Sequence, residues 1–417
     1  MDSSLRRQVI IHLRQGSTHL RRDSIPLSKD TRLPVDNTHP RKVNILLRTA
    51  LTPLNKEAMP RRSLMEHHRH SIRDTEHPRD RRKDSMYGAP GGPPTPASLG
   101  YGAPQIIQWD ARPDAQALRS AMKGFGTDEK TLVRVLATKD PLQIDAIRDA
   151  YSRHIGRNLE KDIESETRGY LEQGLVALAR GPLLNDVHLL RGAISGAGTN
   201  EDVLNDVLLG RSNADMHAIK STYQRVFGRT LEADVKGDLS MKTEQHFMIV
   251  LGANRAEESA PVIPQAIDQE VQELYRATEG KMGTDEMLVC SILSTRSDSQ
   301  IRAINETYER KFRRRLEDMI RKEFSGHMED ALLYQLRSAI NKPVNAAKLL
   351  EDAMAGMGTK DHLLVSRVIR YHWDQRFMAD VKRTYQDRYR KSLASRIKSE
   401  TSGDYERMLL GCIGESV

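Results

Sequence analysis

Apolar residues recur through most of the chain at spacings of three and four, the pattern that places side chains on one face of an α-helix. The clearest series starts after residue 110, where five short apolar stripes follow one another. Such stripes ordinarily face a core, so we expect an all-α fold, with the third helix beginning at Pro141. The stripes are Leu118, Ala121 and Met122; Leu132, Val135 and Leu136; Ile144, Ile147 and Tyr151; Leu159 and Ile163; and Leu171, Leu175 and Leu178.

A short glycine-rich string recurs four times in this helical region, at separations of 72, 85 and 75 residues. The copies are Gly124-Phe125-Gly126-Thr127, Gly196-Ala197-Gly198-Thr199, Lys281-Met282-Gly283-Thr284 and Gly356-Met357-Gly358-Thr359. A second landmark, a Tyr eight positions before a Leu, keeps the same register in the pairs Tyr151/Leu159, Tyr223/Leu231, Tyr308/Leu316 and Tyr385/Leu393. Two landmarks in one register predict four repeats, each with five helices.

The repeats divide the chain into segments of different character. Residues 1–85 have no sustained period and are rich in Arg, His, Ser and Pro, which predicts a disordered basic extension. Residues 86–109 form a Pro/Gly/Tyr-rich tail, expected to be an extended linker, with order beginning near Ile107 to Asp110. Because the composition changes abruptly at Met86, this residue is a candidate for an alternative start of the protein. The expected repeats are residues 110–182, 183–254, 266–341 and 342–417, with a linker at residues 255–265.

The net charge of +8 is concentrated in the extension, since residues 1–85 hold 19 Lys and Arg against 10 Asp and Glu. The remaining residues hold 46 against 47, so the helical body is nearly neutral and nucleic acid is not its expected partner. The extension itself has an open alternative as an RNA or anionic-lipid tether. Cys290 and Cys412 lie in apolar helical patterns and are expected to be buried, reduced thiols. We expect no transmembrane segment.

The glycine-rich string by itself is typical of a tight turn between helices. Glycine allows conformations closed to other residues, and Thr127 or Thr199 would then cap the next helix. Asp202 would complete a Thr-x-x-Asp capping box in the second copy. One isolated string would indicate no more than this turn.

A carboxylate fifteen residues after each landmark Tyr adds chemistry to the turn; the four are Glu166, Asp238, Glu323 and Glu400. In the last copy a two-residue insertion precedes Tyr385, and only the corrected register reaches Glu400. Each carboxylate lies between the fourth and fifth apolar stripes, so a second loop is expected to face the glycine-rich one. Backbone carbonyls and one carboxylate are hard oxygen ligands, which suit Ca²⁺.

A site with a single carboxylate should bind calcium weakly, with a dissociation constant on the order of 10⁻⁴ to 10⁻³ M. Protein oxygens would fill only part of the coordination shell, which leaves room for a lipid phosphate. Several such sites on one face would add through effective concentration. The pattern therefore predicts calcium-controlled attachment to membranes.

The four loops, MKGFGTDE, AISGAGTNED, ATEGKMGTDE and AMAGMGTKDH, together with IKSETSGDY, resemble the annexins. The resemblance covers about residues 110–417. It implies a curved disc of four five-helix repeats, with calcium loops on the convex face. It also places Lys123 and Met282 toward lipid, whereas Ser195 and Ala355 stand where Lys123 does in the first loop and Lys360 adds positive charge to the fourth.

The resemblance implies calcium ligation by loop carbonyls and one acidic side chain in every repeat. The implied ligands are Met122, Gly124, Gly126 and Glu166; Ile194, Gly196, Gly198 and Asp238; Thr278, Lys281, Gly283 and Glu323; and Met354, Gly356, Gly358 and Glu400. It also implies a polar centre of Asp186, Asp206, Arg211 and Arg367, either an ion-pair scaffold or an ion path.

The expected function is calcium-dependent binding to anionic phospholipid membranes such as those with phosphatidylserine, in membrane trafficking or organisation. The protein would be cytoplasmic, and peripheral on membranes when calcium rises; a protein partner could read the tail. The alternative is a helical-repeat interaction scaffold with degenerate calcium loops. We expect no enzymatic activity, since the sequence has no GxxxxGK[ST], HExxH or GxSxG motif and no strand-led GxGxxG.

Overall fold

The structure is a computed structural model, and the residues it describes all belong to one compact unit, Pro78–Val417. The described residues are 92–196, 198–237, 239, 241–279 and 283–416. The predictions made for residues 1–85 therefore fall outside the described part of the chain. So do those made for Asp238, Lys281 and Met282.

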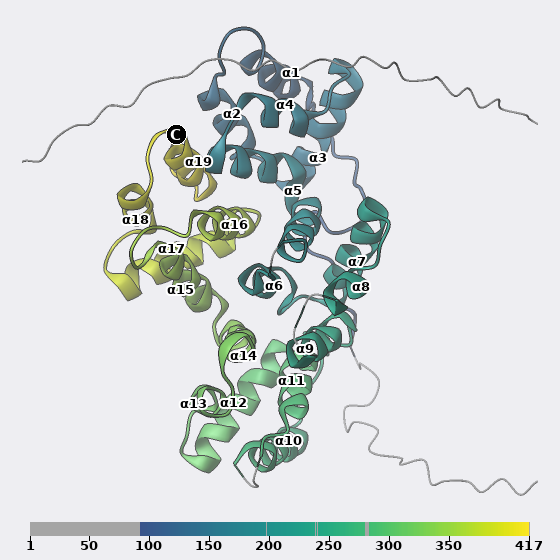
Figure 1. The fold of residues 1–417 in the computed structure, drawn as a ribbon, viewed down its shortest axis with the longest axis vertical. Coiled ribbons are helices and arrows are strands. Elements are labelled where there is room, and N and C mark those ends of the chain that lie inside the picture. Colours follow the sequence, from purple (N-terminus) through teal and green to yellow (C-terminus); the bar gives the residue numbers. More distant parts are fainter. Residues whose placement is uncertain (1–91, 197, 238, 240, 280–282, 417) are drawn as a thin grey trace, which may run out of the picture. The chain divides into compact units, whose positions relative to one another are not determined.

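Regular structure in the described residues is helical throughout, and every repeat contains five helices, with α5 shared between the first two (Figure 1). The first repeat has α1 (Arg112–Ala121), α2 (Glu129–Leu136), α3 (Pro141–Ala150) with a π-helical turn (Tyr151–Ile155), α4 (Leu159–Glu166) and the start of α5 (Gly169–Ala193). The second has the rest of α5, α6 (Glu201–Leu208), α7 (Asn213–Phe227), α8 (Leu231–Lys236) and α9 (Met241–Leu251). The all-α prediction is confirmed.

The other two repeats have separate helices throughout. The third has α10 (Pro264–Thr278), α11 (Glu286–Thr295), α12 (Asp298–Phe312), α13 (Leu316–Glu323) and α14 (Gly326–Ile340). The fourth has α15 (Lys342–Met354), α16 (Asp361–His372), α17 (Gln375–Tyr389), α18 (Leu393–Glu400) and α19 (Gly403–Cys412). No helix in the described residues is long and apolar enough to cross a membrane.

The first two repeats meet inside α5 without a loop. Gly181 breaks the helix there with φ 74° and ψ 173°, a conformation that glycine adopts readily and other residues rarely do. Pro182 follows at once, at the start of a new helical segment where its missing N–H costs nothing. This pair therefore ends the fifth helix of one repeat and begins the first helix of the next.

The landmark tyrosines explain why the repeats fold alike. Their side chains are fully buried in all four copies, at Tyr151, Tyr223, Tyr308 and Tyr385, and the leucines eight positions later are buried with them. The apolar residues form two separate clusters. One cluster joins repeats 1, 2 and 4 and includes Ala331 of repeat 3, and the other lies within repeat 3. Cys290 and Cys412 are free and buried, as the apolar pattern around them predicts.

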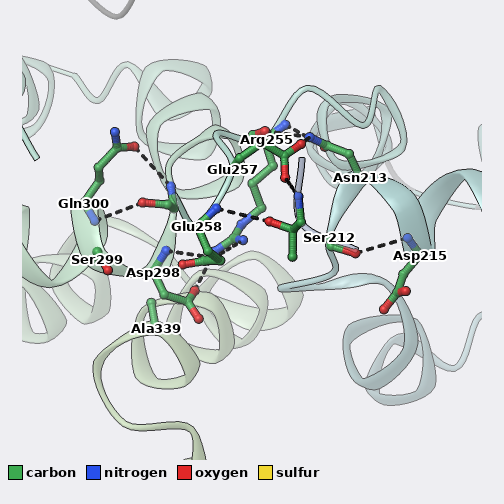
Figure 2. Close-up of polar contacts among 12 residues, drawn as sticks. Ser212, Asn213, Asp215, Arg255, Glu257, Glu258, Asp298, Ser299, Gln300 and Ala339 are labelled. Carbon is green, nitrogen blue, oxygen red and sulfur yellow. Dashed lines mark hydrogen bonds and ion pairs between the residues drawn. The ribbon is translucent and has the colours of Figure 1, made fainter. Parts of the chain in front are cut away.

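Arg255 links repeats 2 and 3 through ion pairs and hydrogen bonds (Figure 2). Its guanidinium pairs with Glu258 and with Asp298 at the start of α12, both at 2.5 Å. Its backbone N–H and C=O bond to the amide side chain of Asn213 on α7, at 3.0 and 2.7 Å. One residue thus joins the third helices of two repeats.

The tail contacts the body earlier than the sequence predicts. Its donors bond to carboxylates of the body: Thr95 N to Glu257 Oε2 (2.7 Å), Ser98 N to Asp215 Oδ1 (2.7 Å), Ser98 Oγ to Asp215 Oδ2 (2.7 Å), and the Tyr101 hydroxyl to Asp186. Tyr101 is buried. The expectation that order begins near Ile107 is therefore wrong, because the acceptors that fix the tail lie far away in sequence.

The predicted helix caps are also wrong by one residue. Asp128 caps α2 by accepting from the backbone N–H of Thr131 at 3.0 Å. Asn200 caps α6 by accepting from the N–H of Val203 at 3.3 Å, so Asp202 completes no capping box there. Thr127 and Thr199 therefore do not cap these two helices.

Candidate calcium sites

Each glycine-rich loop is closed at its base by the same backbone hydrogen bond. The N–H of the residue after the threonine bonds to the C=O of an alanine seven or eight positions earlier, which is the last or next-to-last residue of the preceding helix. The four bonds are Asp128 to Ala121 (2.9 Å), Asn200 to Ala193 (2.9 Å), Asp285 to Ala277 (2.8 Å) and Lys360 to Ala353 (2.8 Å). The same loop closure is therefore formed four times.

The glycines in these loops are required by backbone conformation. In the first loop Gly124 has φ 111° and Gly126 has φ 82°, and nothing lies within 4 Å of the position that a Cβ would take on either. In the fourth, Gly356 and Gly358 have φ values of 105° and 90° and equally open surroundings. A side chain would fit in the space but would strain the backbone.

The threonine of the loop contacts the predicted carboxylate in three repeats. Its hydroxyl donates to the carboxylate Oε2 in the pairs Thr127 and Glu166 (3.0 Å), Thr284 and Glu323 (2.6 Å), and Thr359 and Glu400 (2.8 Å). The partners are 39 or 41 residues apart, so this contact unites the two loops that the sequence predicts to face each other. In the second repeat Asp238 lies outside the described residues.

The other predicted ligands fall into two groups. At the end of each first helix the side chains of Met122, Ile194, Thr278 and Met354 are buried, so their backbone oxygens are what they can offer a cation. The loop glycines that the structure describes follow directly, at Gly124, Gly126, Gly196, Gly198, Gly283, Gly356 and Gly358. Lys123 is exposed in the first loop.

In repeats 1, 3 and 4 the described part of each predicted site offers a cation one carboxylate, not a cluster of several. Lys322 and Thr284, which bond to Glu323, lower the pKa of that carboxyl, so it stays ionised. Among the described residues, no three His, Cys, Asp or Glu side chains gather in a way that could hold a metal ion. A cation here would therefore depend on backbone oxygens as well. The first and third loops, with one facing carboxylate each, fit calcium's preference for oxygen ligands.

The fourth predicted site differs because a guanidinium already contacts two of its predicted ligands. Arg396 on α18 pairs with Glu400 and donates to the backbone carbonyl of Met354. Two of the atoms that the sequence assigns to calcium therefore have a cationic partner within the protein. Sequence reasoning missed Arg396, although it lies one helical turn before Glu400, at a spacing where side chains meet.

Two exposed apolar side chains at the loop tips were also missed. Phe125 and Met357 are fully exposed, at 111% and 107% of the reference area. They occupy the position in the repeated string that Met282 holds in the third repeat, so comparing the four strings would have found them. A single exposed apolar side chain is ordinary by itself, and it is the position of these two at the tips of predicted calcium loops that makes them candidate contacts.

The predicted polar centre is present as ion pairs. Arg367 Nε lies 2.7 Å from Asp206 Oδ2, both buried, and Arg211 pairs with Asp186. Arg370 also contacts Asp186, with Nη2 2.6 Å from Oδ1. Burial raises the pKa of the Tyr101 phenol, which therefore remains protonated and donates to Asp186. The tail and the polar centre are thus connected.

These features define a class: an all-helical repeat protein that pairs glycine-rich loops with facing carboxylates. The annexin sequence profile matches residues 113–178, 185–249, 269–334 and 345–412. The chain belongs to the annexin family.

Other annexins match this chain in sequence and in structure over about three quarters of its length. Annexin C1 of Cryptococcus neoformans is 42% identical over 314 residues, which cover 75% of this chain and 67% of that protein. Human annexin A4 is 38% identical over 307 residues, covering 73% of this chain and 95% of that protein. The solved structure of annexin III matches with a TM-score of 0.71 and 31% identity, over 77% of this chain and all of that one. A calcium-bound annexin, (Sm)1, matches with a TM-score of 0.64 and 26% identity, over 73% and 90%.

Proposed function

We propose that this annexin binds anionic phospholipid membranes, including those with phosphatidylserine, through calcium ions shared between its loops and lipid phosphates. Family membership supports calcium-dependent phospholipid binding in general. The observation that carries the proposal is the recurring hydrogen bond between a loop threonine and the facing carboxylate, seen in repeats 1, 3 and 4. In these three repeats it brings one carboxylate beside the glycine-rich loop, which supports a role for that carboxylate as the acidic ligand.

The proposed ligands in the first repeat are the carbonyls of Met122, Gly124 and Gly126 with the carboxylate of Glu166. In the third repeat they are the carbonyls of Thr278, Lys281 and Gly283 with Glu323, and the second repeat would use Ile194, Gly196, Gly198 and Asp238. Calcium takes six to eight oxygens, so each set leaves positions for lipid phosphate or water. The ion would supply the attraction between two negatively charged partners.

Membrane contact would extend beyond the ions. Phe125 is exposed at the tip of the first loop and could bury its ring among lipid chains or headgroups. Lys123 is exposed beside it and would attract lipid phosphate. Calcium would thus bring the loops to the surface, and these side chains would strengthen the attachment.

Weak individual sites fit a reversible function. Each bridge raises the effective concentration of the others, so attachment would depend steeply on calcium. We infer a cytoplasmic protein that moves to membranes when calcium rises and helps to organise or traffic them. Annexins are generally non-enzymatic membrane binders, and this role needs no catalytic group.

The test is co-sedimentation with phosphatidylserine vesicles in calcium and then in chelator. We expect binding in calcium and release on chelation. Glu166→Gln with Glu323→Gln should raise the calcium requirement while leaving the melting temperature in chelator nearly unchanged. Wild-type protein that ignores the vesicles, or that stays bound after chelation, would overturn the proposal.

A further inference from the structure

An ion pair next to the calcium loop has the same polarity in repeats 1 and 2. In repeat 1, Arg119 near the end of α1 lies 3.5 Å from Asp162 on α4. In repeat 2, Arg191 near the end of α5 lies 2.8 Å from Asp234 on α8. In both, the cation is on the helix before the glycine-rich loop, and the carboxylate is on the helix that leads to the predicted acidic ligand.

The buried landmark tyrosine contacts the acidic member of each pair. The Tyr151 hydroxyl donates to Asp162 at 2.6 Å, and the Tyr223 hydroxyl donates to Asp234 at 2.8 Å. Each hydrogen bond stabilises the carboxylate of the pair in a largely buried setting. A second arginine also pairs with each aspartate, Arg157 with Asp162 at 2.7 Å and Arg229 with Asp234 at 2.6 Å. The arrangement is therefore a repeated structural unit, in which a tyrosine and two arginines hold one aspartate.

Repeat 4 contains the same unit with the charges exchanged. Glu351 on α15 stands where Arg119 and Arg191 do, and Arg396 on α18 stands eleven residues after its landmark tyrosine, as Asp162 and Asp234 do. Arg396 Nε lies 3.4 Å from Glu351 Oε2. The hydroxyl of Tyr385 still donates to the carboxylate, which is now Glu351.

The exchange brings a guanidinium to the calcium ligands. Arg396 is one turn before Glu400 on the same helix, and it pairs with Glu400 Oε1 through Nη1. Its Nη2 donates to the carbonyl of Met354, and its Nε faces Glu351. One planar group thus engages three oxygens on two helices, with only 19% of its side chain exposed.

We propose that Arg396 acts as a built-in competitor of calcium in repeat 4, so that this repeat takes up the ion only at concentrations above those that fill repeats 1 and 3. The inference rests on the proposed function of the loops. A guanidinium and Ca²⁺ both seek the Glu400 carboxylate and the Met354 carbonyl, and the guanidinium is tethered beside them. Calcium must displace the guanidinium, which then remains close to the occupied site as a second positive charge.

Two comparisons support a special role for the fourth loop. Lys322 contacts Glu323 in repeat 3 at 2.8 Å, but that lysine is 58% exposed and can swing away into water. In repeat 4 the residue after the loop threonine is Lys360, whereas the other repeats have Asp128, Asn200 and Asp285 there. Repeat 4 thus carries additional positive charge on both sides of its predicted site, from Lys360 in the glycine-rich loop and from Arg396 on α18.

The charge exchange can be reversed in the protein. Glu351→Arg combined with Arg396→Asp restores the polarity of repeats 1 and 2, keeps an ion pair, and gives Tyr385 a carboxylate in the usual place. Arg396→Met is a second variant, because repeat 3 has Met319 at the equivalent position. Bound calcium is counted by equilibrium dialysis with radioactive calcium and phosphatidylserine vesicles across a calcium series.

We expect both variants to bind about one more calcium per chain than wild type at concentrations that fill repeats 1 and 3. The half-saturation point of the added site should fall on the order of tenfold, the effect of removing one charge-assisted interaction. Adding Glu400→Gln to the exchanged variant should abolish the gain.

The outcomes separate this inference from the proposed function. Wild-type protein that binds no calcium with vesicles present contradicts the proposed function itself. Wild-type protein that binds calcium, together with folded variants that show unchanged stoichiometry and affinity, overturns the role of Arg396 alone. Circular dichroism in chelator checks that the variants are folded. If Arg396→Met is unstable, the exchanged variant alone tests the role of Arg396.

Discussion

The hydroxyl of Thr127 donates a 3.0 Å hydrogen bond to Oε2 of Glu166, across 39 residues of sequence. The bond orients the carboxylate toward the glycine-rich loop before any cation arrives. The threonine is free for this contact because Asp128, the next residue, caps the helix. A ligand held in place in advance loses less freedom on binding, so the cost of assembling the site falls.

Replacing the loop threonines should therefore weaken calcium binding without unfolding the protein. We expect Thr127→Val with Thr284→Val to raise the calcium needed for half-maximal vesicle binding by about threefold to tenfold, because each loses a hydrogen bond worth about 1 kcal/mol. Thr138→Val is the matched control, since its exposed hydroxyl bonds only to helical carbonyls at the end of α2. An equal effect from the control would argue against an orienting role.

Removing the apolar loop tips should weaken membrane attachment and leave calcium binding in solution unchanged. Phe125→Ser with Met357→Ser should lower vesicle affinity by about tenfold, corresponding to about 1.4 kcal/mol of lost apolar burial. The loss should persist at high salt, because it is not electrostatic. Ile106→Ser is the control, an equally exposed apolar residue in the tail. Unchanged vesicle binding by the double variant would exclude loop insertion.

His246 should make the protein less stable in mild acid. Burial lowers the pKa of its imidazole from 6.5 to about 4, and neither ring nitrogen has a partner among the described residues. The unfolded chain takes up a proton as pH falls below 6.5 while the folded chain does not until about 4. Stability is therefore fully present above the unfolded pKa and is lost on going down to the folded one.

When the pH falls from 7 to 5, the His246 imidazole alone should lower the free energy of unfolding by about 2 kcal/mol. His246→Leu should remove that share of the pH dependence in urea unfolding. Thr138→Val, an exposed position where no titratable group is changed, should leave the slope as it is in wild type. Identical pH slopes for wild type and His246→Leu would contradict the assignment.

The tail should loosen when its two hydroxyl anchors are removed. Ser98→Ala with Tyr101→Phe deletes the side-chain bonds to Asp215 and Asp186. Asp186 keeps its contacts with Arg211 and Arg370, so the body should lose little stability. Hydrogen exchange should quicken in residues 95–101 and remain unchanged in α16. Unaltered exchange in the tail would show that its other contacts suffice.

Much of the fold was readable from the sequence because periodicity and repetition act locally. The five-helix pattern, the buried tyrosines and the register that reaches Glu400 all follow from spacing. The pairing of Thr359 with Glu400, 41 residues apart instead of the 39 of repeats 1 and 3, agrees with a two-residue insertion in repeat 4.

What spacing could not supply were partners chosen in three dimensions. The caps were misplaced because threonine and its neighbour are both good capping residues, and only the facing Glu166 decides between them. Spacing could not show where the tail becomes ordered, since its acceptors lie between 85 and 162 residues away. Arg396 escaped notice because a lone cation on a helix is ordinarily solvated, and its meaning appears only beside Glu351 and Met354.

Repeat 3 keeps most of its buried apolar residues in a cluster of their own, apart from the one that the other three repeats share and that Ala331 joins. Loss of that cluster would leave most of the larger one in place, so this quarter of the body can melt as a separate cooperative unit. Heating would then give two transitions rather than one, and a single midpoint would describe neither. Arg255, bonded to both α7 and α12, would set how far apart the two transitions fall.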